Sequence, residues 1–308
     1  MVRRNYALVV LGVGLVLVVL ALLRVLPRDF VAAGAALAFF GLVLTGLSFV
    51  RRPEAPADAP APLSAFERIA GLFYEPSRVF QNLRAHPRWL AALAVIVLLN
   101  FIYATAFTRR LTPERIVGFN MDKVVESGWM PADMAEEQKR EQIAAAKSPA
   151  RTAVGAVNQF VFAFIFMCIV ACLYLLGVLV FGGRINFWQA LAVTVHAMLP
   201  PAVISSVLSL LILFLKDPAE VHPIRNANGL VQDNLSVLFS PAARPVLFTL
   251  ASFISVLSFY KLWLTATGLR NGGERVSSTA AWSAAVAVWL IGVLLAVTLA
   301  AIAPGFIA

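Results

Sequence analysis

The chain has few charged residues and few of the residues that build catalytic centres. Of its 308 residues, 13% are charged and 60% are hydrophobic, and there are only three histidines and two cysteines. The signatures of P-loop enzymes, zinc proteases and nucleophile-elbow hydrolases are missing. His86, His196 and His222 lie far apart in the sequence, and Cys168 and Cys172 lie one turn apart in one apolar run, where buried core residues are usual. We therefore expect no enzyme activity, no cofactor and no metal.

Acidic residues are missing from every long apolar run. Proton-driven transporters commonly use carboxylates within the membrane as relays, so that mechanism lacks its usual groups. The formal net charge is +9, but no basic run with interleaved aromatic residues lies outside the apolar runs. The excess of Lys and Arg is interpreted as flanking charge that holds loops at a membrane surface, and nucleic acid is not expected as a partner.

What the chain does contain is a series of apolar runs long enough to cross a bilayer, which takes about 20 residues of α-helix. About seven such runs follow one another, and none shows the alternating pattern of a β-barrel strand. The chain is therefore predicted to be an all-α, polytopic membrane helical bundle with about seven transmembrane helices. The expected spans are residues 6–26, 30–50, 89–107, 153–181, 184–216, 245–268 and 280–302.

A segment rich in proline and alanine, residues 51–64, marks a boundary between two modules. Before it, residues 1–50 form a predicted hairpin of two spans. After it, residues 65–308 form a predicted membrane domain of five spans. Arginine pairs at positions 3–4 and 51–52 flank the hairpin, and they indicate a cytoplasmic N-terminus.

The five-span domain begins with an amphipathic element. Apolar and basic residues recur at helical spacing on both sides of Pro76, so a kinked helix on the cytoplasmic membrane surface is predicted. Its phenylalanines would supply apolar contact area, and its arginines would attract anionic lipid head groups. The alternative is that the element packs on the protein's own loops. The predicted membrane-surface contacts are Phe66, Arg68, Phe73, Arg78, Phe80 and Arg84.

The fifth span has two prolines, Pro200 and Pro201, at its centre. Because they remove two backbone donors, we expect the helix to break there, one turn after His196. Lipid cannot satisfy the freed carbonyl groups, so a polar pocket that faces the bundle is predicted. The alternative is a satisfied kink that holds no ligand. The residues of the predicted pocket are His196, Pro200, Pro201, Asn100, Asn158 and Gln159.

A further basic residue, Lys261, lies near the end of the sixth span. We expect its side chain to extend to the cytoplasmic interface.

Several stretches resemble one family of membrane proteins. They are residues 65–93, the Gly-Gly turn with Phe-Trp-Gln-Ala-Leu at 187–191, the His196…Pro200-Pro201 pattern, and Phe-Tyr-Lys-Leu-Trp at 259–263 before Gly268. From residue 63 onward the chain is similar to the Yip family, the Ypt/Rab-interacting integral membrane proteins, in its bacterial branch. The resemblance implies a domain of five spans and a bacterial inner membrane location. Eukaryotic members bind small GTPases; this chain adds the N-terminal hairpin, and their acidic cytoplasmic motif is not identified in it.

Two classes of function remain. The first is a membrane interaction, scaffold or membrane-organising protein that acts through its cytoplasmic 51–88 segment. Its expected partners are the lipid bilayer, anionic lipid head groups and an unidentified membrane or cytoplasmic protein. The second is a permease or lipid-handling protein that uses the Pro-broken fifth span as a gate, because discontinuous helices build transporter sites.

Overall fold

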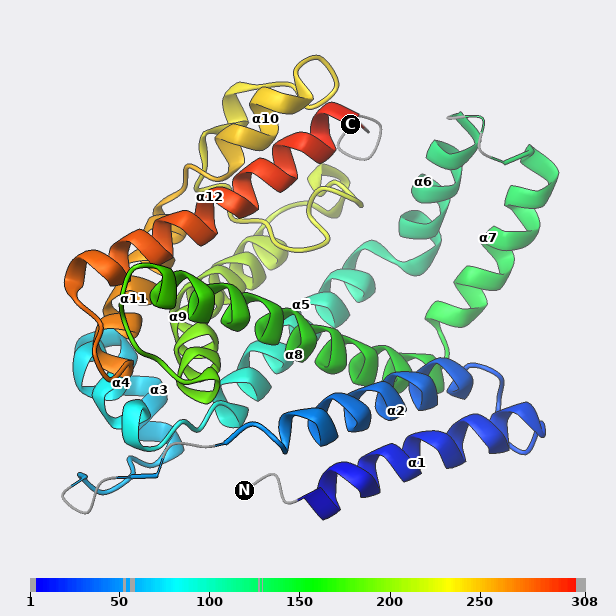
Figure 1. Ribbon diagram of the computed structural model, residues 1–308. Helices are drawn as coiled ribbons and strands as arrows, with labels where there is room; N and C mark the ends of the chain where they lie inside the picture. The colour runs from blue at the N-terminus through cyan, green and yellow to red at the C-terminus, as the bar shows by residue number, and fades with distance from the viewer. Residues whose placement is uncertain (1–3, 52–53, 56–58, 127, 129, 303–308) are drawn as a thin grey trace. The chain divides into compact units, whose positions relative to one another are not determined.

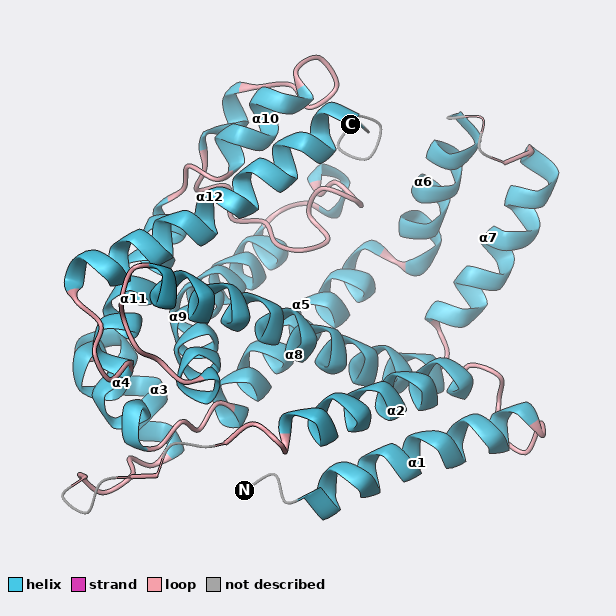
Figure 2. Ribbon diagram, viewed as in Figure 1, coloured by secondary structure: helices cyan, strands magenta, loops and turns pink. Residues whose placement is uncertain are grey.

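The computed structural model describes residues 4–51, 54–55, 59–126, 128 and 130–302. Every regular element in these ranges is a helix (Figures 1 and 2), and only two isolated backbone bridges occur. The prediction of an all-α polytopic membrane bundle is confirmed. Within the described ranges, six helices are long and apolar enough to cross a membrane: α1 (Arg4–Leu22), α2 (Phe30–Leu47), α5 (Leu90–Leu111), α8 (Pro149–Val180), α9 (Phe187–Leu215) and α12 (Ser278–Ile302).

Shorter helices connect or flank these six. Polar composition or a proline at the start explains most of them, since Pro at the first helical position is preorganised for a helix. They are α3 (Ala65–Tyr74), α4 (Pro76–Ala85), α6 (Pro113–Glu126), α7 (Ala132–Ala146), α10 (Pro245–Ser252), α11 (Val256–Gly272) and the 3₁₀ turns η1 (Pro218–Glu220) and η2 (Leu235–Leu238).

The chain forms two compact units, each assembled from several segments. Unit 1 comprises residues 1–51, 97–165 and 206–230, and unit 2 comprises residues 52–96, 166–205 and 231–308. The predicted hairpin of residues 1–50 belongs to unit 1, where α1 and α2 run side by side (Figure 1). The predicted five-span domain contributes to both units, so the boundary at residue 64 is not the division between them.

The predicted break at Pro200-Pro201 is wrong, because α9 is continuous from Phe187 to Leu215. The two prolines still leave the carbonyl groups four residues earlier without their helical donors. This part of α9 is densely packed. Ala197 and Leu199 are at most 1% exposed, and both prolines are buried. A transmembrane helix tolerates proline where such packing surrounds it.

The helix break lies instead in the predicted sixth span, which forms α10 and α11 with an extended residue, Ser255, between them. The Ser255 hydroxyl accepts a hydrogen bond from the Ser258 N–H at 2.9 Å. The Asp233 carboxylate accepts one from the Leu257 N–H at 2.9 Å, and the Leu235 N–H donates to the Ile254 carbonyl at 3.2 Å. The start of α11 is therefore capped by residues of its own loop and of the η2 loop.

Small residues set the distance between α1 and α2 within unit 1. A Cβ placed on Gly14 would lie 2.3 Å from the Ala38 backbone nitrogen, and one on Gly41 would lie 2.4 Å from that of Leu11. A Cβ on Gly12 would meet nothing within 4 Å. Close backbone approach through small residues is a usual mode of helix association in membranes.

Replacing Gly14 by leucine is expected to separate α1 from α2 and to lower the free energy of unfolding by about 1–3 kcal/mol, because the new side chain overpacks a backbone contact. Unfolding in mixed detergent micelles measures this loss. Gly12→Leu is the matched control and should change stability much less. Equal losses for the two variants would show that the Gly14 contact does not hold the hairpin.

Candidate functional site

The amphipathic element consists of two short helices, α3 and α4, and the sequence explains where each begins. The Ser64 hydroxyl accepts from the Glu67 N–H at 3.2 Å, and the Glu67 carboxylate accepts from the Ser64 N–H at 2.7 Å. This capping box starts α3, and its hydrogen bonds lower the pKa of Glu67. Pro76 then ends the first helix and starts the second.

Burial divides the six predicted membrane contacts into two groups. Phe66 is 79% exposed and Phe73 45% exposed, while Arg78 and Arg84 are also exposed. Tyr74, which sequence reasoning did not select, is 67% exposed beside Phe73. The four predicted residues that are exposed are therefore accessible to a membrane or a partner.

The other two predicted contacts, Arg68 and Phe80, require correction. Phe80 is fully buried and its ring packs against Gly268 of α11, where a Cβ would lie 2.9 Å from the ring. Arg68 is 5% exposed, and its guanidinium donates to the Leu63 carbonyl at 2.7 Å. Both side chains belong to the inner face of the α3–α4 pair and hold it in unit 2.

The chain before α3 is attached to α4 by hydrogen bonds. The Asn82 side chain accepts from the Leu63 N–H at 3.1 Å and donates to the Ala61 carbonyl at 2.9 Å. The His86 ring lies 3.0 Å from the Pro60 carbonyl oxygen. The inner side of the element thus packs on the protein's own loops, as the alternative interpretation proposed, while its outer side stays exposed.

Two other segments of unit 2 lie at the same end as α4. The Gln189 side chain donates to the Arg84 carbonyl at 2.9 Å, and the Arg84 guanidinium donates to the Glu274 carbonyl at 3.2 Å. Arg184 and Arg275 form a short backbone bridge. The α4 helix, the turn before α9 and the turn before α12 therefore belong to one end of unit 2 and to one side of the membrane.

The predicted polar pocket draws its residues from both units. In unit 2, His196, Pro200 and Pro201 are buried, and His196 is 1% exposed. Its Nδ1 lies 2.8 Å from the Ala192 carbonyl oxygen, and since a carbonyl only accepts, Nδ1 carries the proton. The side chain is thus satisfied at one nitrogen by its own helix.

The remaining predicted pocket residues belong to unit 1. Asn100 is exposed, which argues against a place in a pocket. The Asn158 side-chain oxygen is buried and finds no hydrogen-bond partner among the described residues. Gln159 lines a cavity of about 560 Å³ together with Thr105 and Thr152. A pocket that joins these residues to His196 stays a prediction.

Unit 2 contains a cavity of about 470 Å³ that sequence reasoning missed. Helix α9 faces it with Thr194 and Met198, each two residues from His196. Two residues correspond to about 200° around an α-helix, so His196 points to the other side. The residue in the sequence that could have indicated this cavity is Lys261. It lines the cavity, whereas we expected its side chain to extend to the cytoplasmic interface.

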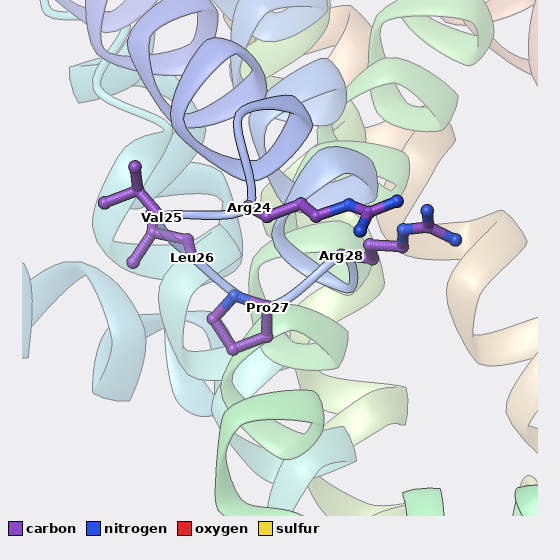
Figure 3. A pocket seen from close by; sticks show the side chains of 5 residues that line it. All are labelled: Arg24, Val25, Leu26, Pro27 and Arg28. Atoms are coloured by element: carbon purple, nitrogen blue, oxygen red, sulfur yellow. The ribbon is translucent and has the colours of Figure 1, made fainter.

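A third hollow lies in the loop between α1 and α2, and five consecutive residues line it (Figure 3). Arg24 and Arg28 extend to one side of this loop, and Val25 and Leu26 extend to the other. Because no other element contributes to it, this hollow is the inside of a turn and offers no built site.

Comparison with protein families agrees with this architecture. A family model described as the Yip1 domain matches residues 70–300, about three quarters of the chain. The chain belongs to the Yip1 family. The Yip1-domain match includes the 187–191 stretch. In this stretch Trp188 is 1% exposed and Gln189 is 2% exposed, and the Gln189 side chain donates the hydrogen bond to the Arg84 carbonyl of α4. The comparison with curated proteins and that with solved structures found no match.

Replacing Asn82 by leucine is expected to release residues 59–63 from α4, because both hydrogen bonds to this segment are lost. We expect proteinase K to cut the segment about tenfold faster, which corresponds to the loss of one or two hydrogen bonds. Limited proteolysis of the full chain in detergent, with the fragments identified by mass spectrometry, measures the rate. Gln81→Leu is the control, since Gln81 bonds Asn271 and not the segment. Unchanged cleavage of the Asn82 variant would show that these bonds do not hold it.

Proposed function

We propose that this Yip1-domain protein is a membrane interaction or scaffold protein that organises the membrane, or recruits a partner protein, through its 51–88 segment. The proposal places this segment and the N-terminus on the cytoplasmic side of a bacterial inner membrane. It assigns no catalytic reaction to the chain.

The observation that supports this proposal is the split between the two faces of the α3–α4 pair. The inner face is held by Phe80, Arg68 and the Asn82 bonds, so the element has a fixed orientation on unit 2. The outer face carries Phe66, Phe73 and Tyr74, which are 45–79% exposed. A rigidly mounted pair of helices that presents three aromatic rings is suited to insertion into a lipid interface or to capture of a partner helix.

Basic residues accompany the aromatic ones. Arg78 and Arg84 are exposed on α4, and Arg78 forms an ion pair with Glu75 at 3.0 Å. Each basic side chain near an anionic leaflet contributes about 1 kcal/mol of attraction. The last turn of α11 adds Arg270, and the turn before α12 adds Arg275, at the same end of unit 2. This distribution supports anionic lipid head groups as one binding partner.

The alternative function, a permease or lipid-handling protein with a gate at Pro200-Pro201, loses the observation that motivated it. The α9 helix is continuous through both prolines. A gating role would have to use another part of the chain.

The membrane role of the outer face can be measured with an environment-sensitive dye at position 66. In a chain with Cys168 and Cys172 replaced by alanine, Phe66→Cys labelled with nitrobenzoxadiazole should fluoresce more strongly, and at shorter wavelength, in nanodiscs that contain phosphatidylglycerol than in pure phosphatidylcholine. The reason is that anionic lipid attracts the arginines of the α3–α4 pair, which brings the dye at position 66 into the membrane interface.

The matched control is Gln138→Cys with the same dye, since Gln138 lies exposed on the polar helix α7. Its emission should be that of a dye in water with either lipid. If position 66 also reports water with both lipids, the segment does not contact the membrane, and capture of a protein partner would be the only form of the proposal left.

A further inference from the structure

The cavity of unit 2 combines the size of a ligand site with an apolar lining. Its volume of about 470 Å³ lies within the range of about 300–1,000 Å³ usual for sites of small molecules. Side chains of α8, α9, α11 and α12 form its wall. Every contributing segment belongs to unit 2, so the cavity is complete within one compact body.

Lys261 is the one charged residue among those that line this cavity. Within the described part of the chain, its amino group forms no hydrogen bond and no ion pair. Helices α8 to α12 contain no Asp or Glu, so these helices provide no counter-ion for it. An ionisable residue inside a membrane domain is expensive, and it usually marks a functional position with a partner.

The position of Lys261 along α11 places it far from the nearest basic residue at the helix end. It precedes Arg270 by nine residues, which corresponds to about 13 Å along the helix. It follows Val256, the first residue of α11, by five residues, or about 7.5 Å. Because the helices that line the cavity carry no carboxylate, an anionic group is the natural partner for this amino group.

The cavity opens toward lipid. Three of its lining residues are largely exposed on the outside of the spanning helices, namely Phe166 at 55%, Leu295 at 67% and Leu299 at 57%. An apolar chain can therefore enter from the bilayer without crossing water. The threonines at the closed side, Thr194 and Thr265, are 5% and 2% exposed.

These threonines cannot replace an anion for Lys261. Thr194 donates to the Ala190 carbonyl at 2.8 Å, and Thr265 donates to the Lys261 carbonyl at 2.8 Å, so each hydroxyl proton is used within its own helix. Their oxygens can accept one bond, but they carry no negative charge. The positive charge at the polar end of the cavity, which an anionic group can match, is therefore that of Lys261.

We propose that this cavity binds a membrane amphiphile by its anionic end, with a carboxylate or phosphate group on Lys261 and one acyl chain along the α12 wall toward Leu295 and Leu299. Charge complementarity in a medium of low dielectric supplies the specificity, and the apolar wall supplies the contact area. The site is separate from the surface role proposed for residues 51–88 and does not depend on it.

Gly292 offers a way to fill the cavity without touching Lys261. It lines the cavity on α12, and a Cβ placed on it would meet nothing within 4 Å. A leucine at this position would extend into the space that the acyl chain occupies. The matched control is Gly46→Leu on α2, which also meets nothing within 4 Å and introduces the same side chain into another membrane helix.

The test uses the full chain in phosphatidylcholine vesicles with photoactivatable lipids that carry a diazirine on the acyl chain. A fatty acid, a phosphatidylglycerol and a phosphatidylcholine are used in separate samples, and mass spectrometry locates the adducts. We expect the anionic probes to label the cavity wall on α8 and α12 more than phosphatidylcholine does. Labelling by the fatty acid alone would identify a free carboxylate as the ligand group, and labelling by phosphatidylglycerol would identify a phospholipid phosphate.

The variants separate charge from volume. Lys261→Met should lower cavity labelling by about tenfold or more, the effect of losing one charge-assisted hydrogen bond, while Lys261→Arg should retain most of it. Gly292→Leu should lower it similarly, and Gly46→Leu should leave it unchanged. If Lys261→Met does not fold, labelling of the Lys261→Arg and Gly292→Leu variants still tests the proposal. Equal labelling by phosphatidylcholine, or full labelling of the Gly292→Leu chain, would overturn the proposal.

Discussion

In the hydrocarbon core of a membrane, every backbone N–H and C=O group needs a partner from the protein, and the fold follows from how this chain meets that requirement. Long helices satisfy it internally, except at the two prolines of α9. At α9 the helix continues through two prolines in densely packed surroundings. Between α10 and α11 it does not continue, and Ser255 and Asp233 supply the acceptors that the first turn of α11 needs.

The sequence predicts the long helices well, because about 20 consecutive apolar residues without charge have one common solution in lipid. It predicts the location of the helix break poorly. Proline is the strongest local breaker, yet its effect depends on packing by segments distant in the chain. The actual break depends on Asp233, 24 residues before the N–H that it accepts from, and no local pattern reports such a contact.

The candidate sites show the same limit. Helical spacing identified the amphipathic element, and it selected Phe66 and Phe73 for the outer face. It also selected Phe80, because sequence alone does not distinguish an apolar residue facing lipid from one facing Gly268 of another helix. The sequence did not indicate the cavity of unit 2: the predicted pocket was placed at His196, on the side of α9 that faces away from this cavity, and Lys261 was interpreted by its distance from a helix end. Whether Lys261 faces a cavity depends on the packing of α8, α9, α11 and α12 together, which the sequence around Lys261 does not show.

The two candidate sites therefore lie where the chain departs from the plain transmembrane helix: at the α3–α4 pair, which presents aromatic rings outside the bundle, and at Lys261, which places a charge inside it. Both are within unit 2, and the Yip1-domain match covers Lys261 and the pair from residue 70 onward. The first suits contact with a surface or a partner, and the second suits an anionic ligand that enters from lipid. The capped break between α10 and α11 comes just before Lys261 in the chain, and Phe253 beside the break lines the cavity.

Hydrogen–deuterium exchange of the full chain in nanodiscs tests the central structural claim most directly. The account predicts that amides of residues 202–204, just after the prolines of α9, exchange as slowly as those in the rest of that helix. It predicts faster exchange at Ser255 and Val256, between α10 and α11, with Leu257 and Ser258 protected by their capping bonds. Rapid exchange after Pro201 together with slow exchange at 255–256 would contradict the account, since the helix break would then lie at the prolines.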